Sequence, residues 1–351
     1  MTYAPADLTR HPLTTKEGWR AFVSTARPSP PQLLPAADWT RLDDVEREIY
    51  NDMRRGYHAE LLLVATPEIR QITTTGAKLI VNNRGKQLGR RGLIVSGPSG
   101  TGKSTSITQL GKRHQLELER RSPGVTDRVP VVYIIVPPAA TPKMLAIEMA
   151  GFLGLPVSPH DSQHTITQSV VAVMRAVRCG LVLVDEVHRL DLRTRSGAEA
   201  SDQLKYFFDS ISATFVYAGL DLAANGMFSG MRGGQIAGRF VSLRTSTFAH
   251  TTREQRETWA RVVATMEDSL RLHRHVPGSL VEMAPYLNQR TGGMIGSLDQ
   301  LVYEAANDAI TDGTERITRK HLDAVILDAA AQAQYDLLPA RRRTPAGGTA
   351  T

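Results

Sequence analysis

Cysteine is almost absent from this sequence. Cys179 is the only one among 351 residues, so the chain can form neither an internal disulfide bond nor a cysteine-built zinc site. The scarcity agrees with a reducing compartment. We therefore interpret Cys179 as a small buried apolar side chain and expect a cytoplasmic protein.

Long apolar runs are absent too. No stretch approaches the roughly 20 apolar residues that cross a bilayer, and residues 1–13 contain no apolar run typical of a signal peptide. These absences predict no membrane association. The hydrophobic share of 41% and the charged share of 22% are nevertheless ordinary for a globular protein, which excludes disorder throughout.

Acidic residues are fewer than basic ones. The 42 Lys and Arg residues against 35 Asp and Glu residues give a net charge of +7. Such an excess favours a polyanionic partner through counterion release. A bound nucleotide could account for it equally well, so charge alone leaves nucleic-acid binding open.

Before residue 59 the pattern predicts an N-terminal extension, residues 1–58. Proline at 28, 30 and 31 excludes a regular helix or central strand there. One amphipathic helix is expected between Trp39 and Gly56. Its apolar side chains recur at helical spacing, at Leu42, Val45, Ile49 and Met53.

Residues 59–250 alternate short apolar runs with helical stretches. Runs that are apolar on both faces predict buried parallel strands, and the stretches between them are long enough for crossover helices. The fold class is therefore α/β, a three-layer parallel-sheet domain. The expected strands are residues 93–95, 131–136, 181–184, 215–218 and 240–243, and the expected helices 104–120, 142–153, 165–178 and 198–210.

No strand-like run follows Thr251. The pattern predicts a small all-helical lid domain over residues 251–335, with helices near 252–273, 278–290, 294–311 and 318–334. Leu301, Ala305, Ala306 and Ile310 are expected in its core. Residues 336–351, which include three consecutive arginines, predict a disordered basic tail.

One segment has the spacing of a phosphate-binding P-loop. Gly97 to Ser104 matches G-x-x-x-x-G-K-[ST] between an expected strand and an expected helix. We expect Lys103 to reach the β- and γ-phosphates of ATP and Ser104 to place its hydroxyl on Mg²⁺. The residues predicted to hold the nucleotide are Gly97, Pro98, Ser99, Gly100, Thr101, Gly102, Lys103, Ser104 and Thr105.

Two carboxylates follow the apolar run that ends at Val184. We expect this strand to neighbour the P-loop, so that Asp185 holds the magnesium shell. Glu186 would then orient or polarise the attacking water. The pair predicts hydrolysis of ATP as well as binding.

These elements together resemble the AAA+ superfamily, and within it the TniB and TnsC group of transposon-encoded ATPases. The resemblance covers about residues 60–330. It is carried by the P-loop, Thr66-Pro67, Asp185-Glu186-Val187-His188, Gly238-Arg239-Phe240 and the glycine-rich segment Thr291 to Leu298.

The resemblance implies an ATPase that oligomerises, as a ring or a helical filament, on double-stranded DNA. Such a protein passes a chosen target to a DDE transposase, often with a TniQ-like adaptor. Arg239 matches the arginine that contacts the γ-phosphate of a neighbouring subunit, although a surface arginine at a sheet edge is the alternative. Lys143 lies where the resemblance implies a DNA-contacting loop, with Thr165 or Thr167 near a second contact, while Thr141-Pro142 also fits a simple helix cap.

Two departures from the superfamily pattern predict slow hydrolysis. The strand at residues 215–220 ends without the polar residue that commonly contacts the γ-phosphate, and Gly296 stands near the usual position of a second arginine. Two other functions remain open. One is a helicase-loader-like ATPase resembling DnaC or IstB, and the other a nucleotide-dependent signalling or defence switch that does not use DNA.

Overall fold

A computed structural model describes residues 11–26, 28–60, 66–222 and 238–337 of the chain. They form two compact units. One contains the described residues up to Ala26 together with those from Pro67 to Thr245, and the other contains those between 27 and 66 together with those from Ser246 onward. Within these residues, no helix is long and apolar enough to cross a membrane.

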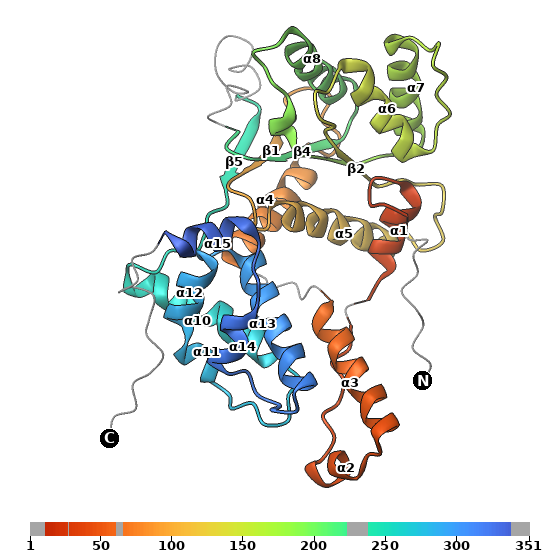
Figure 1. Ribbon diagram of the computed structural model, residues 1–351. Helices are drawn as coiled ribbons and strands as arrows, with labels where there is room; N and C mark the ends of the chain where they lie inside the picture. Colours follow the sequence, from red (N-terminus) through yellow and green to blue (C-terminus); the bar gives the residue numbers. More distant parts are fainter. Residues whose placement is uncertain (1–10, 27, 61–65, 223–237, 338–351) are drawn as a thin grey trace. The chain divides into compact units, whose positions relative to one another are not determined.

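Five parallel strands form the sheet of the first unit (Figure 1). Their order is β2-β3-β4-β1-β5, and Leu93 of β1 lies opposite Val216 of β4 and Val241 of β5. Every predicted apolar run is a strand, which confirms the α/β class. The strands are β1 (Gly92–Ser96), β2 (Val131–Ile135), β3 (Leu181–Asp185), β4 (Thr214–Gly219) and β5 (Phe240–Arg244).

Helices cover both faces of this sheet, as the three-layer prediction required (Figure 1). One face carries α1 (Lys16–Ser24), α4 (Pro67–Asn83) and α5 (Lys103–Arg121). The other carries α6 (Pro142–Leu153), α7 (Gln163–Ala176) and α8 (Arg195–Ser210). The bounds of the crossover helices agree with the predicted bounds to within a few residues. The spacing of apolar residues determines both the prediction and the helix that forms.

Helix α1 corrects the expectation that the extension holds a single helix. Thr15 caps it by accepting a hydrogen bond from the Gly18 amide at 3.1 Å. Trp19 is 2% exposed, donates to Gln115 Oε1 at 2.9 Å and stacks on Tyr133. Burial of one large aromatic side chain against the sheet domain thus makes α1 part of that domain.

The second unit contains helices and no strand among its described residues. Leu301, Ala305, Ala306 and Ile310 are buried in its core, as predicted. Residues 338–351 of the expected basic tail lie outside the described part of the chain, and Asp336 ends a helix. The helices are α2 (Ala36–Arg41), α3 (Asp44–Ala59), α10 (Arg253–Asp268), α11 (Ser279–Glu282), α12 (Ala284–Thr291), α13 (Ile295–Thr311), α14 (Arg319–Ala324) and α15 (Ala329–Asp336).

The predicted helix at 39–56 is divided into α2 and α3, and its buried face is not the apolar one. A capping box between Asp43 and Glu46 starts α3. Val45, Ile49 and Met53 are exposed by 70%, 51% and 45%. The buried side chains of α3 are instead Tyr50, Arg54, Tyr57 and His58.

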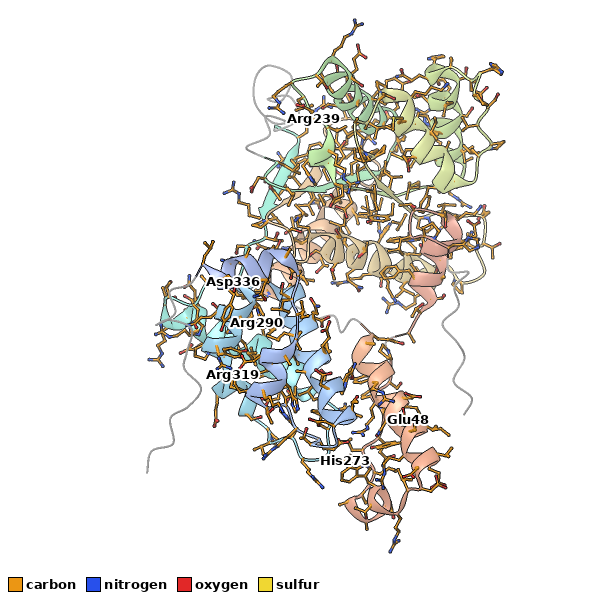
Figure 2. All side chains as sticks on the ribbon, viewed as in Figure 1. Glu48, Arg239, His273, Arg290, Arg319 and Asp336 are labelled. Atoms are coloured by element: carbon orange, nitrogen blue, oxygen red, sulfur yellow. The ribbon has the colours of Figure 1, made fainter. Side chains whose placement is uncertain are left out.

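Polar groups attach α3 to the other helices of its unit. Arg54 is fully buried and makes two hydrogen bonds, of 2.7 and 2.8 Å, to the Glu315 carboxylate. Glu315 also accepts a hydrogen bond from the backbone amide of His273. The His273 ring shares a hydrogen bond of 3.0 Å with the Tyr50 hydroxyl (Figure 2). A bidentate arrangement of this kind fixes geometry as well as charge.

His58 adds a second attachment. Its Nε2 accepts the Arg271 amide at 3.0 Å, so Nδ1 carries the proton that faces Asn307 Oδ1. Burial lowers the pKa of His58 to about 4. The ring is therefore neutral at pH 7, as these two bonds require.

We predict that Arg54→Met lowers the free energy of unfolding by about 3–5 kcal/mol, because it leaves the Glu315 carboxylate buried without its partner. Arg55→Met is the matched control. Arg55 pairs with Glu48 and Asp52 at the surface, where ion pairs contribute about 1 kcal/mol or less. Denaturant unfolding of both variants measures the difference, and equal losses would contradict a special role for the buried pair.

Candidate nucleotide site

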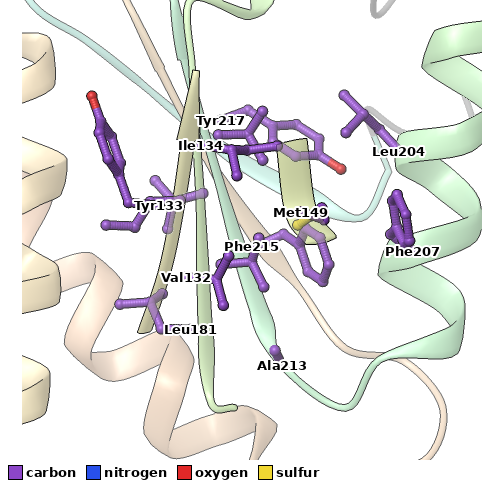
Figure 3. Packing of buried hydrophobic residues seen from close by; sticks show 14 of the residues in the cluster. Val132, Tyr133, Ile134, Met149, Leu181, Leu204, Phe207, Ala213, Phe215 and Tyr217 are labelled. Atoms are coloured by element: carbon purple, nitrogen blue, oxygen red, sulfur yellow. The ribbon is translucent and has the colours of Figure 1, made fainter. Parts of the chain in front are cut away.

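Buried strands hold the site in place. β1, β3 and β4 are buried along their whole length. Figure 3 shows Met149, Leu204 and Phe207 packed near Phe215 and Tyr217 of β4. Because the strands are parallel, their carboxyl ends meet at one edge, where such folds place ligands.

The P-loop leaves β1 at this edge. Thr245, just after β5, donates its amide to Ser96 O at 2.8 Å. A Cβ at Gly97 would lie 2.2 Å from Thr245 O, so only glycine fits there. Gly102 has φ +82°, a left-handed conformation that turns the chain into α5.

Lys103 is the first residue of α5 and is 7% exposed. Its ammonium donates to the carbonyl of Pro98 at 2.5 Å. Burial lowers the pKa of Lys103, while the charges of Asp185, Glu186 and Asp221 oppose that shift. Ser104 and Thr105 follow in the first turn, where the helix N-terminus favours anions.

Asp185 ends β3 and is 2% exposed. It accepts the Tyr133 hydroxyl at 3.2 Å and the Glu186 amide at 2.8 Å. The end of β3 lies near the P-loop, as expected, since the charge of Asp185 acts on Lys103. The two strands are not hydrogen-bonded neighbours, because β4 lies between β3 and β1. Strand order depends on long-range pairing and is not encoded in the local apolar pattern.

Glu186 has a left-handed backbone, φ +59°, which costs a non-glycine residue about 1–2 kcal/mol. Its Oε2 lies 3.3 Å from an Arg189 guanidinium nitrogen and 3.6 Å from His188 Nε2. His188 Nδ1 in turn accepts the Leu220 amide, just after β4, at 3.3 Å. These partners hold the carboxylate at the sheet edge.

Sequence reasoning missed both partners of Glu186. The spacing of three residues between Glu186 and Arg189 could have indicated this ion pair, because residues three apart on a helical turn are neighbours. The turn is the 3₁₀ helix Val187–Arg189.

Arg239 lies at the opposite edge of the sheet. It directly precedes β5, its carbonyl accepts the Gly92 amide, and its side chain is about half exposed (Figure 2). The guanidinium pairs with Asp209 at 2.6 Å. A five-residue strand spans about 15 Å, so Arg239 is not close to the P-loop of its own chain.

Lys143 and Thr165 lie in the first turns of α6 and α7. Thr141 caps α6 as predicted, accepting the Met144 amide at 3.2 Å. Lys143 donates to Pro159 O at 3.1 Å, in the segment that leads to α7. Thr165 is exposed and shares a hydrogen bond with Ser162, the cap of α7.

A family model described as "Bacterial TniB protein" matches residues 57–250, more than half of the chain. The chain belongs to the TniB family. No curated protein matches this TniB-family chain.

Solved structures share its fold. Aeropyrum pernix ORC1, solved in complex with DNA, is 20% identical, with a TM-score of 0.56 over 79% of this chain and 67% of that chain. The ADP form of Aeropyrum pernix ORC2 is 14% identical, with a TM-score of 0.57 over 77% and 72%. Cdc6p from Pyrobaculum aerophilum is 16% identical, with a TM-score of 0.52 over 75% and 67%.

Family and fold together make this TniB-family chain an AAA+ ATPase. Its own residues fit the metal that ATP carries. Among the described residues no cluster of three or more His, Cys, Asp or Glu could hold a metal ion by itself. The Ser104 hydroxyl and the Asp185 carboxylate are few, hard oxygen donors, which suits Mg²⁺ because it keeps waters and phosphate ligands.

We predict that Lys103→Ala abolishes tight nucleotide binding, because the phosphates lose their buried cation. Glu186→Gln should retain binding and lower hydrolysis by about 10²–10⁴-fold. Glu199→Gln, an exposed carboxylate on α8 paired with Arg195, is the control and should change neither. Fluorescent-nucleotide titration and phosphate release measure the two steps, and unchanged hydrolysis in Glu186→Gln would remove that residue from the mechanism.

Proposed function

We propose that this chain is an ATP-dependent regulator of DNA transposition. With ATP and Mg²⁺ bound it assembles on double-stranded DNA as a ring or helical filament. The assembly selects the target and recruits a DDE transposase, with a TniQ-like adaptor as a further partner. Hydrolysis then dissolves the assembly.

The position of Arg239 carries this proposal. The P-loop and Arg239 lie at opposite edges of one parallel sheet, about a strand length apart. An arginine that stabilises phosphoryl-transfer charge must contact the transferred phosphate. If Arg239 has that role, it acts on the nucleotide of a neighbouring subunit, and each complete site requires two chains.

The chemistry of hydrolysis follows from the residues at the carboxyl edge. Lys103 and the amides of the first turn of α5 hold the phosphates, while Ser104 and Asp185 hold the Mg²⁺ that arrives with them. The ion supplies charge neutralisation on the phosphates when bound. Glu186 accepts a proton from the attacking water once its carboxylate leaves Arg189.

Slow hydrolysis fits these contacts. The Glu186 carboxylate is engaged by Arg189 and His188, and releasing it adds a conformational step before chemistry. Leu220 follows β4 at the place where AAA+ proteins commonly have a polar residue that contacts the γ-phosphate. A slow cycle suits a timing switch, because the assembly must persist long enough to recruit a partner.

DNA binding is proposed at the first turns of α6 and α7. Each helix N-terminus carries partial positive charge, Lys143 adds a full charge, and the Thr165 hydroxyl adds a neutral donor. These groups recognise phosphates and not base edges. Aeropyrum pernix ORC1, which shares the fold, was itself solved with DNA.

Family membership favours transposition over a helicase-loader role, because the match is to TniB over the sheet domain. The alternative to be tested is a signalling switch that does not use DNA. Salt-dependent binding of duplex DNA separates it from both DNA-based functions.

We predict that Arg239→Ala and Glu186→Gln subunits, each inactive alone, recover ATP hydrolysis when mixed. In the mixed assembly, an Arg239→Ala subunit keeps its P-loop and Glu186 and receives Arg239 from its Glu186→Gln neighbour. Phosphate release at several mixing ratios, with assembly followed by light scattering, is the measurement. If both variants assemble and no ratio restores activity, Arg239 does not act between subunits.

With a non-hydrolysable ATP analogue, we predict duplex binding that changes little when the DNA sequence is scrambled. Lys143→Ala should weaken binding and reduce the slope of log affinity against log salt by about 0.9, the value for one phosphate contact. Thr165→Ala should weaken binding without changing the slope, because its hydroxyl is neutral. Fluorescence anisotropy at several salt concentrations measures both.

Arg253→Ala is the control for this experiment. Arg253 is a highly exposed arginine on α10 that pairs with Glu257, and its loss should leave the slope unchanged. No duplex binding by the analogue-bound protein at low salt would favour the switch that does not use DNA.

A further inference from the structure

A basic pocket lies at the amino edge of the sheet, the edge at which the parallel strands begin. A pocket of about 530 Å³ opens where the amino ends of β3 and β4 meet the last turns of α4 and α5. None of the lining residues that the structure describes is acidic. Five are cationic, namely Arg84, Lys86, Arg121, Arg128 and Arg178.

Nearby carboxylates neutralise only part of this charge. Arg121 pairs with Glu117, and Arg178 pairs with Asp127. Two polar atoms of the lining residues are buried without a hydrogen-bond partner among the described residues, Arg128 Nε and His114 Nε2. Buried polar atoms are nearly always paired in folded proteins, so these two indicate a missing partner.

His114 can supply a neutral donor. Burial, together with the charge of Arg84, lowers the pKa of His114 to about 4. The ring is therefore uncharged at neutral pH and can direct one N–H into the pocket. Its Nε2 would lie only 3.2 Å from a Cβ at Gly180, so glycine leaves room beside the ring.

The backbone of one lining residue is strained. Arg178 has φ +54° and precedes β3 by three residues. A left-handed arginine costs about 1–2 kcal/mol relative to an ordinary conformation, and such conformations cluster at functional sites.

We infer that this pocket binds the phosphate groups of a small phosphorylated ligand. Its volume is within the range of small-molecule sites, and guanidinium groups match phosphate oxygens in geometry as well as charge. The buried atoms lie in a pocket, which suits a small ligand better than the repeating phosphates of a duplex.

The ligand is distinct from the ATP of the P-loop. α5 begins at Lys103 beside the P-loop and reaches Arg121 at this pocket, 18 residues later. At 1.5 Å per residue the two ends are about 27 Å apart, farther than one nucleotide extends. The pocket therefore constitutes a separate anion site.

An adjoining pocket of about 520 Å³ offers room for an organic part of the ligand. It shares Leu118, Ser122 and Arg128 with the basic pocket. Val23, Val125 and Pro130 contribute apolar surface there. The phosphates could therefore come from a nucleotide or from an inorganic polyphosphate, and the experiment below distinguishes these sources.

The test uses pyrophosphate as the probe and full-length Lys103→Ala protein, in which the P-loop is disabled. Isothermal titration calorimetry should show one saturable site. Adding Arg128→Gln or Arg84→Gln should weaken it about 10- to 100-fold, as expected when a charged hydrogen-bond donor is lost. Arg193→Gln, a 91% exposed arginine paired with Asp191, is the control and should change nothing.

Arg84 is exposed, so Arg84→Gln keeps the test valid even if Arg128→Gln fails to fold. Competition with ADP then identifies the source, since displacement of pyrophosphate indicates a nucleotide and no displacement indicates an inorganic ligand. Three results would overturn the inference: no saturable binding, equal affinity in both pocket variants and the control, or displacement of pyrophosphate by duplex DNA.

Discussion

Parallel pairing of five buried strands is the constraint on which the rest of the sheet domain depends. Since β1, β3 and β4 are covered on both faces, the polar side chains of the candidate sites lie where the strands begin or end, at the amino and carboxyl edges of the sheet. The carboxyl edge collects the P-loop, Asp185 and Glu186. The amino edge collects Arg239 and the basic pocket. The parallel sheet therefore keeps the P-loop apart from the residues that we propose to act on a neighbouring subunit or to bind a second ligand.

At the carboxyl edge of the sheet, burial and nearby charges act in opposite directions on the pKa of Lys103. Lys103 is buried, which disfavours its charge, yet Asp185 and Glu186 lie near enough to counteract that effect. Asp185 is fixed by the Tyr133 hydroxyl and by a backbone amide, whereas the contacts of the Glu186 carboxylate are with the side chains of Arg189 and His188. A fixed carboxylate proposed to hold Mg²⁺, next to a proposed base that only side chains hold, suits the slow ATP hydrolysis proposed above.

The helical unit is organised differently. Its α3 uses a buried Arg54–Glu315 pair and a neutral His58 in place of an apolar face. Ion pairs of this kind contribute more to a defined geometry than to stability, because desolvation offsets much of their attraction. The exposed positions of Val45, Ile49 and Met53 follow from this arrangement.

Sequence by itself determined the α/β class, the five strands, the crossover helices and the P-loop. Each depends on local apolar spacing or on a contiguous motif. Only the tertiary structure decided the insertion of β4 between β3 and β1, the docking of α1 through Trp19, the polar face of α3 and the partners of Glu186. The same holds for the placement of Arg239 and the basic pocket at the edge opposite the P-loop. These features join residues far apart in the chain, as Arg54 and Glu315 show, and no local pattern encodes such pairings.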